Sequence, residues 1–250
     1  MAEVLLKVSD LYKSYGGVAA TDHINLEILR GEIHAVIGPN GAGKTTLISQ
    51  LAGEQMPDGG RVEFQGHEIT HLPAHTRAMQ GLARSFQITS IVHDLRVIDN
   101  VALSVQAQIG HSFHFWKPAR ADIALTEPAM EALRRVGLED RAAEVSRNLS
   151  HGEHRQLEIA MALAANPTLL LLDEPMAGMG TEESARMVEI LSSLKGEKTM
   201  LLIEHDMDAV FALADRISVL VYGRVIATGT PEEIKGNDEV RKAYLGDEDS

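Results

Sequence analysis

A glycine-rich segment near the start of the chain has the composition of a phosphate-binding loop. Glycines let backbone N–H groups wrap closely around an anion. The segment fits the pattern G-x-x-x-x-G-K-[S/T], in which the lysine contacts the β- and γ-phosphates of a nucleotide and the hydroxyl holds Mg²⁺. We assign nucleotide contacts to Gly38, Pro39, Asn40, Gly41, Ala42, Gly43, Lys44, Thr45 and Thr46, and a Mg²⁺ contact to Thr45.

Two adjacent carboxylates follow an apolar run later in the chain. The run Leu169–Leu172 is typical of a buried strand, and Asp173 and Glu174 come directly after it. A solvated strand end would have the same pattern. Because a phosphate loop is present, we expect Asp173 to lie on the Mg²⁺ side and Glu174 to polarise an attacking water.

The segment Leu149–Glu153 combines a helix start with a candidate anion site. Ser150 and Glu153 form an S-x-x-E capping box, which predicts that a helix begins here. A helix N-terminus with a serine hydroxyl and Gly152 beside it can bind an anion through its free N–H groups. The alternative is a capped helix with no ligand.

The flanking segments predict the elements that position these residues. A strand over 33–37 precedes the phosphate loop, and a helix over 46–52 follows it. Strand-like segments at 4–8, 24–29 and 61–64 indicate an antiparallel β region. Strand–helix–strand units imply a mostly parallel sheet. We therefore predict an α/β fold. Met187, Ile190, Leu191 and Leu194 predict an amphipathic helix between two of the strands. Residues 217–221 and 224–227, joined at Tyr222–Gly223, predict a final hairpin.

Residues 88–149 differ from the rest of the chain. Ile98, Val101, Val105 and Ile109 recur at helical spacing, and a second helix closes at Gly137. The segment 110–118 holds three of the ten aromatic residues. It is either a loop with a small satellite core or a contact with a membrane partner.

The composition limits the functional classes. The chain has 250 residues and a net charge of −13, which disfavours non-specific nucleic-acid binding because that binding depends on Lys and Arg. It has no cysteine, which excludes disulfides and thiolate metal sites. We find no signal peptide and no apolar stretch long enough to span a membrane.

The order of the three motifs resembles the ATP-binding subunits of ABC transporters. Between the phosphate loop and Leu-Leu-Leu-Asp-Glu-Pro stands Leu-Ser-x-Gly-Glu, which distinguishes this family from other P-loop NTPases. No guanine-reading Asn-Lys-x-Asp segment is present. The resemblance implies a RecA-like P-loop core, ATP and Mg²⁺. It also implies that Tyr15 stacks on adenine, that Gln87 contacts Mg²⁺ and water, and that His205 contacts the γ-phosphate. Lys44, Gln87, Glu174 and His205 are then the catalytic group.

The resemblance further implies one ATPase domain over 1–250. Its core comprises 1–87 and 150–235, its helical subdomain 88–149, and its C-terminal tail 236–250. Two such subunits pack head to tail as a homodimer or heterodimer. Ser150, Gly152 and Glu153 of one chain then bind the ATP held by the other. Implied partners are two transmembrane permease subunits and, indirectly, a periplasmic or extracellular solute-binding protein. The implied location is the cytoplasmic face of the inner membrane, with no nucleic-acid partner.

Several features resemble the larger ATPase of Liv-type, branched-chain amino-acid importers. They include Gly16–Gly17, the run after Glu174, the aromatic segment and the end of the chain. An ATPase of lipopolysaccharide export and a non-transport ABC protein are the alternatives. Two positions depart from the family pattern: His151 replaces the usual glycine of the signature, and Gly180 replaces an aspartate.

Overall fold

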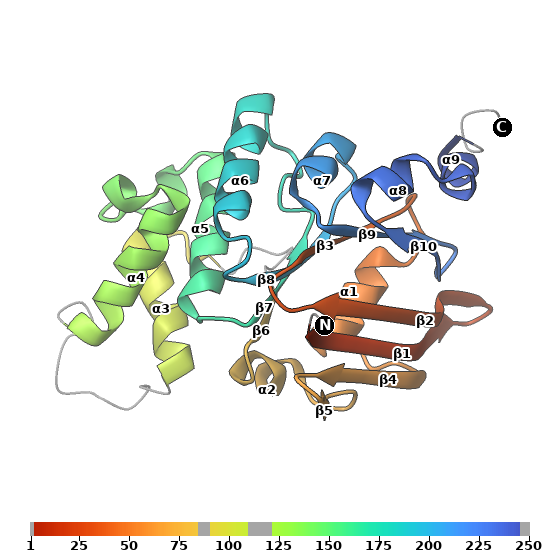
Figure 1. The fold of residues 1–250 in the computed structure, drawn as a ribbon. Coiled ribbons are helices and arrows are strands. Elements are labelled where there is room, and N and C mark those ends of the chain that lie inside the picture. The colour runs from red at the N-terminus through yellow and green to blue at the C-terminus, as the bar shows by residue number, and fades with distance from the viewer. Residues whose placement is uncertain (1–2, 85–90, 110–121, 246–250) are drawn as a thin grey trace.

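The structure is a computed structural model, and it describes residues 3–84, 91–109 and 122–245. Figure 1 shows two sheets, with a group of helices beside them. Within the described ranges, no helix is both long enough and apolar enough to cross a bilayer.

The central sheet is six-stranded and mostly parallel. Its order is β10 (Arg224–Gly229), β9 (Arg216–Val221), β3 (Ile33–Ile37), β8 (Thr199–Ile203), β7 (Leu169–Asp173) and β6 (Leu82–Arg84). Every pair is parallel except β10 with β9. All residues of β3, β7 and β8 are buried, which explains their continuous apolar sequences, since both faces of such a sheet are covered.

Helix α1 (Lys44–Ala52) lies between the central sheet and a four-stranded antiparallel sheet (Figure 1). The second sheet has the order β2 (Val18–Leu29), β1 (Val4–Tyr15), β4 (Gly59–Phe64) and β5 (His67–Glu68). Leu47, Ile48 and Leu51 of α1 are fully buried and share one hydrophobic cluster with residues of both sheets. This packing fixes the helix whose first turn carries Lys44 and Thr45.

The opposite face of the central sheet is covered by α6 (Thr181–Ser193), α7 (Met207–Leu213) and α8 (Pro231–Lys235), with α9 (Asp238–Leu245) beside β10. The predicted amphipathic stripe is confirmed, because Met187, Ile190, Leu191 and Leu194 are all buried. The predicted hairpin is also confirmed. Its turn residues Tyr222 and Gly223 both have positive φ, 45° and 79°, as the favoured tight hairpin turn requires.

Three helices follow β6 and precede β7 in the chain: α3 (Val97–Ile109), α4 (Ile123–Val136) and α5 (His151–Ala164). They lie together beside the sheets, at the left of Figure 1. Short 3₁₀ turns, Glu139–Arg141 and Ser146–Asn148, connect α4 to α5. Helix α4 ends at Gly137 with φ 72°, as predicted. Of the predicted apolar stripe on α3, Val101 and Val105 are buried but Ile109 is 52% exposed. The aromatic segment 110–118 lies outside the described residues.

The predicted α/β class with a P-loop core is confirmed. Strands β1 and β2 are longer than the sequence pattern indicated, because register shifts between them interrupt the alternation of apolar residues.

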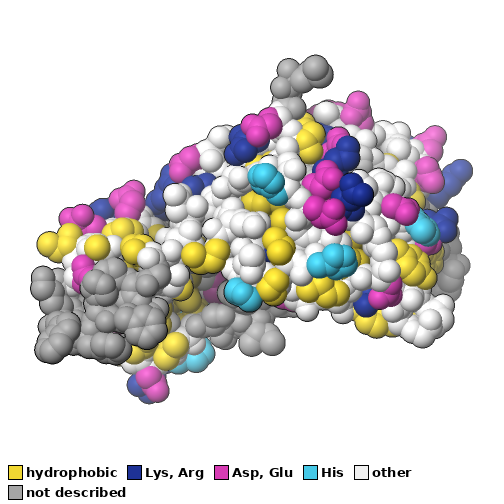
Figure 2. Space-filling view, turned by 90° about the horizontal axis from the view of Figure 1, so that it is seen from below, with side chains coloured by type: hydrophobic (Ala, Val, Ile, Leu, Met, Phe, Trp, Pro, Cys, Tyr) yellow, Lys and Arg dark blue, Asp and Glu magenta, His cyan; other side chains and the backbone are white. Residues whose placement is uncertain are grey.

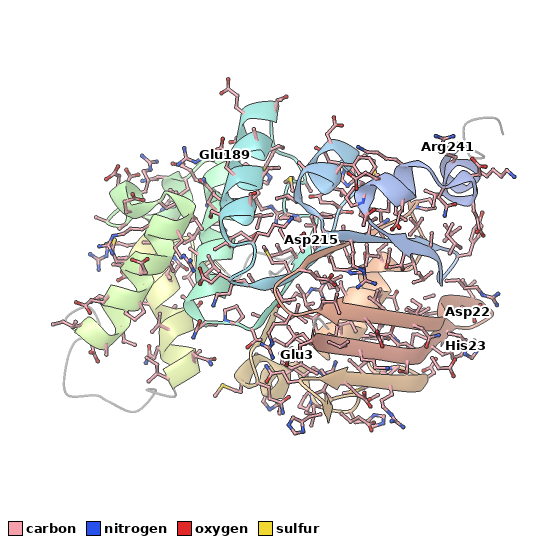
Figure 3. All side chains as sticks on the ribbon, in the orientation of Figure 1. Glu3, Asp22, His23, Glu189, Asp215 and Arg241 are labelled. Atoms are coloured by element: carbon pink, nitrogen blue, oxygen red, sulfur yellow. The ribbon has the colours of Figure 1, made fainter. Side chains whose placement is uncertain are left out.

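Figure 2 views the molecule from below Figure 1, and the Lys and Arg side chains on that face are interspersed with Asp and Glu. At one end of the sheets, Asp22 of β2 pairs with Arg224 of β10 at 2.6 Å (Figure 3).

A buried arginine fixes the C-terminal end of α1. Arg77, on α2 (Ala74–Met79), is fully buried and donates hydrogen bonds to the carbonyl oxygens of Gln50, Leu51, Thr70 and Leu72 at 2.7–2.8 Å. Burial lowers the pKa of its guanidinium to about 10, so the group stays charged at neutral pH. Cationic donors at a helix C-terminus also complement the helix dipole.

We expect Arg77→Met to lower the free energy of unfolding by about 3 kcal/mol or more, because several buried carbonyl groups lose their donor at once. Denaturant titration of the nucleotide-free protein measures this. Arg61→Met is the matched control, since the Arg61 side chain is 58% exposed. Equal effects of the two substitutions would show that the buried contacts of Arg77 contribute little to the free energy of unfolding.

Candidate functional site

The predicted site residues follow the carboxyl ends of adjacent parallel strands. The phosphate loop follows β3, His205 follows β8, and Asp173 and Glu174 close β7. Because β3, β8 and β7 are neighbours in the sheet, these residues meet at one edge. Ligands of open α/β sheets bind at such an edge. Gln87 follows β6 in the sequence but lies outside the described residues.

Two glycines of the phosphate loop are required by the close approach of other backbone segments. A Cβ on Gly38 would lie 2.0 Å from the carbonyl oxygen of Leu220. A Cβ on Gly43 would lie 2.0 Å from the carbonyl oxygen of Ala20, and Gly43 has a φ of 106°, which L-residues rarely adopt. The loop is therefore held between β9 and β2, and these close approaches leave no room for a side chain at either glycine.

Lys44 lies folded into its own loop. Its Nζ donates to the carbonyl oxygens of Gly38, at 2.6 Å, and Pro39, at 3.0 Å. Burial lowers the pKa of the ammonium group, and the charges of Glu174 and Asp173 act in the opposite direction. The amino group of Lys44 is thus held within the loop by two backbone carbonyl groups. Thr45, by contrast, is exposed in the first turn of α1, and Thr46 is half-buried.

Asp173 is buried and paired with a cation that sequence reasoning missed. The Nη2 of Arg84 donates to Asp173 Oδ2 at 2.8 Å. Burial raises the pKa of the Asp173 carboxyl, and the hydrogen bond from Arg84 acts in the opposite direction. The sequence signal was a basic residue at the end of the short apolar strand β6.

Glu174 adopts an unusual backbone conformation for a glutamate. Its φ is 49°, and its N–H donates to the carbonyl oxygen of Ile203 at 2.9 Å. Such left-handed residues are uncommon and gather at functional sites. The Glu174 Oε1 lies 3.8 Å from the Nδ1 of His205, whose side chain is 64% exposed.

Glu204 is a second residue that sequence reasoning missed, and its carboxylate holds the backbone beside Glu174 and at His205. It is fully buried. Its Oε1 accepts the N–H of Met176 at 3.0 Å and its Oε2 accepts the N–H of His205 at 3.0 Å. Glu204 therefore ties the segment after Glu174 to the start of the segment after β8. The sequence showed only a polar residue at a strand end.

Tyr15 ends β1 and is 46% exposed. The Nζ of Lys13 lies 5.7 Å from the ring centroid. The ring is accessible at the tip of the β1–β2 hairpin, and β2 also supplies Ala20, the neighbour of Gly43. Stacking on adenine stays a prediction.

The capping box at the start of α5 is confirmed. Ser150 Oγ accepts the N–H of Glu153 at 3.2 Å, and Glu153 Oε2 accepts the N–H of Ser150 at 2.8 Å. A hollow of about 290 Å³ opens here, and Ser150, Gly152, Glu153 and Gln156 line it together with residues of α6 and the end of α4. No residue of the phosphate loop is among the described residues that line it.

The two departures from the family pattern lie at neighbouring helix starts, His151 at the start of α5 and Gly180 before α6. His151 Nε2 donates to the carbonyl oxygen of Ala177 at 3.1 Å, which joins α5 to the segment after Glu174. Gly180 precedes α6, and its N–H donates to Glu183 Oε2 at 3.3 Å. A Cβ on Gly152 would lie 2.6 Å from Glu183 Oε1. The beginnings of α5 and α6 are therefore in direct contact.

The donor chemistry of the edge fits a Mg²⁺-nucleotide. The cradle supplies backbone N–H groups and an ammonium for phosphate oxygens. Thr45 supplies an exposed hydroxyl, and Asp173 supplies a carboxylate; hard oxygen ligands of this kind suit Mg²⁺.

Comparison with known proteins agrees with this geometry. The family model "ABC transporter" matches residues 21–177, and the model "Branched-chain amino acid ATP-binding cassette transporter" matches residues 224–250. The chain is 37% identical to the high-affinity branched-chain amino acid transport ATP-binding protein LivG of Salmonella typhimurium, over 99% of this chain and 100% of LivG. It is 32% identical to the lipopolysaccharide export system ATP-binding protein LptB of Haemophilus influenzae, over 98% of each.

A solved structure shows the same fold. The crystal structure of a nucleotide-free ATP-binding cassette from an ABC transporter superposes with a TM-score of 0.86 at 28% identity, covering 96% of this chain and 98% of that one. The matched family model spans more than half of the chain, and full-length relatives exceed 30% identity. The chain therefore belongs to the ABC transporter family, as one of its ATP-binding, ATP-hydrolysing subunits.

Proposed function

We propose that this subunit powers an importer for branched-chain amino acids or a related small solute. The observation that carries the proposal is the 37% identity to LivG over the full length of both chains. The catalytic edge alone would suit any ATPase of the family. The match of residues 224–250 to the branched-chain amino acid model supports the same cargo class from a separate part of the chain.

The proposed roles follow from the positions of the side chains. Lys44 holds the β- and γ-phosphates. Glu174 polarises the attacking water, whose oxygen bonds to the γ-phosphorus while the bond to the β–γ bridging oxygen breaks, releasing ADP and phosphate. His205, whose ring lies 3.8 Å from Glu174, contacts the γ-phosphate and orients that carboxylate. Positioning and charge stabilisation supply most of the catalysis in phosphoryl transfer.

Thr45 and Asp173 are proposed to hold Mg²⁺, with Gln87 as a further contact. When bound, the ion would supply positive charge that offsets the charge of the phosphate groups. Tyr15 is proposed to stack on adenine, because its ring is exposed at the end of β1.

A second ATPase subunit, either a copy of this chain or a sister chain, is proposed to complete each site. The hollow at the start of α5 supports this, because Ser150, Gly152 and Glu153 open onto a surface separate from the phosphate loop. These residues would bind the γ-phosphate of the nucleotide on the other chain. The bond from His151 to Ala177 would then link that contact to the segment following Glu174.

The membrane partners are proposed to be two permease subunits, fed by a solute-binding protein, with this chain peripheral on the inner membrane. An apolar hollow of about 480 Å³ supports a docking surface. It lies between α2, α3 and α5 beside β6, and Met79, Met161 and Ala162 are among the described residues that line it. A concave apolar surface of this kind suits a protruding segment of a partner.

Lipopolysaccharide export is the second candidate, supported by the similarity to LptB. That similarity is weaker, at 32% against 37% identity. In addition, the family model that matches residues 224–250 is one for branched-chain amino acid transporters, which supports import and not lipopolysaccharide export.

Reconstitution tests the cargo. The chain would be purified with the permeases and binding protein encoded beside its gene and placed in lipid vesicles. We expect leucine, isoleucine or valine on the binding protein to stimulate ATP hydrolysis and to be taken up. Uptake of a different solute would correct the cargo. Stimulation by lipopolysaccharide, with no effect of any solute, would overturn the import function.

A further inference from the structure

We propose that Arg84 is a positioning residue for the metal side of the nucleotide site: it sets Asp173 relative to helix α1, and the Mg²⁺-dependent part of nucleotide binding depends on it. The inference rests on the proposed placement of Mg²⁺ between Thr45 and Asp173. It adds a residue to which neither the sequence motifs nor the proposed function gave a role.

The guanidinium of Arg84 bridges two elements of the site. Its Nη2 donates to Asp173 Oδ2, at the end of β7, at 2.8 Å. Its Nη1 donates to Ser49 Oγ, on α1, at 3.1 Å, and also bonds the carboxylate of Glu54, just beyond α1. The planar fork of arginine makes such a bridge rigid, because its donors point in fixed directions.

The pair lies in the interior. The side chains of Arg84 and Asp173 are 8% and 1% exposed. A buried carboxylate needs a partner, and removing that partner leaves an uncompensated charge. Water therefore cannot simply replace Arg84 at Asp173. The bond engages Oδ2, which leaves Oδ1 of the same carboxylate for a second ligand.

The bridge reaches the side of α1 that carries Thr45. Ser49 follows Thr45 by four residues, and residues four apart lie on the same face of a helix. Arg84 therefore links the carboxylate of β7 to the helix face of the proposed hydroxyl ligand. Mg²⁺ demands near-ideal octahedral geometry, so the relative position of these two oxygen donors matters. Partners that orient metal ligands in this way typically change metal affinity about 10–100-fold when removed.

The test separates Mg²⁺-dependent binding from nucleotide binding itself. A fluorescent ATP analogue is titrated into the full chain in excess EDTA and again in millimolar Mg²⁺. The ratio of the two Kd values gives the gain due to Mg²⁺. For Arg84→Met we expect the EDTA Kd to stay within about twofold and the Mg²⁺ gain to fall about tenfold. Arg84→Lys keeps the charge without the fork, and we expect an intermediate gain.

Glu54→Gln is the matched control, because it alters the outer contact of Arg84 and leaves Asp173 untouched. Its Mg²⁺ gain should equal that of the wild type. An unchanged Mg²⁺ gain in Arg84→Met would overturn the proposal. Equal losses of nucleotide affinity in EDTA and in Mg²⁺ would also overturn it, because they indicate a merely structural role. If Arg84→Met does not fold, an unchanged gain in Arg84→Lys overturns it. A wild-type chain with no Mg²⁺ gain would instead refute the proposed metal site.

Discussion

Replacing Glu174 by glutamine is expected to lower ATP turnover by about 10²–10⁴-fold, the range that general base catalysis contributes, while ATP still binds. The amide has nearly the same shape as the carboxylate but cannot accept a proton from water. We expect Lys44 to keep its place in the loop, because its hydrogen bonds go to the carbonyl groups of Gly38 and Pro39 and not to Glu174. Phosphate release at saturating ATP measures turnover, and a fluorescent ATP analogue measures binding.

Glu189→Gln is the control for the Glu174 substitution. Glu189 is an exposed glutamate on α6 (Figure 3), so its replacement changes the net charge equally without touching the site. Turnover in this control should match the wild type. If Glu174→Gln retained wild-type turnover, Glu174 would not act on the water, and His205 would become the next candidate.

The chemical core of the site could be predicted because its residues are close together in the sequence. The phosphate loop and the pair Asp173–Glu174 each depend on a strand end followed by polar residues, and a strand end is visible as a run of apolar residues. The capping box of Ser150 and Glu153 is also local, since its two hydrogen bonds join residues three apart. Patterns of this kind can be interpreted from the sequence, because the residues that form the contact are close together along the chain.

The residues that support the site could not be predicted in this way. Arg84 is 89 positions from Asp173, and Glu204 is 28 positions from Met176. A buried charge shows no pattern in the sequence until its partner is known. Arg77 is similar: its acceptors are backbone carbonyl groups, which every residue has, so no residue type marks the contact. The adjacency of β6 and β7 brings Arg84 to Asp173, and the adjacency of β7 and β8 brings Glu204 to Met176.

The exposed end of α3 illustrates a second limit. Ile109 has the spacing of Val101 and Val105 but is exposed, because periodicity describes one helix face and not the length of the surface that covers it. The same limit applies to the hollow beside β6, which is lined by apolar residues such as Met79, which is exposed, and Met161, which is partly buried.

Replacing Ser150 by alanine is expected to weaken ATP-driven dimerisation much more than nucleotide binding to the single chain. Ser150 Oγ lies on a surface separate from the phosphate loop, so its proposed ligand is the nucleotide of the other subunit. Losing one direct hydrogen bond to a charged phosphate costs about 1.5–3 kcal/mol, or about tenfold or more in the dimer dissociation constant. Analytical ultracentrifugation with ATP in a Glu174→Gln background, where we expect slow hydrolysis to let the ATP-bound dimer accumulate, measures this constant.

The substitution also removes a helix cap, which costs about 1 kcal/mol of stability, and a matched variant separates the two effects. Thr230 and Glu233 form the same capping box at the start of α8, away from α5. Thr230→Ala should lower stability by a similar amount and leave dimerisation unchanged. If Ser150→Ala reduced dimerisation and single-chain ATP binding equally, or if Thr230→Ala had the same effect on the dimer, the serine would be a cap alone and the shared site would have to be built from other residues.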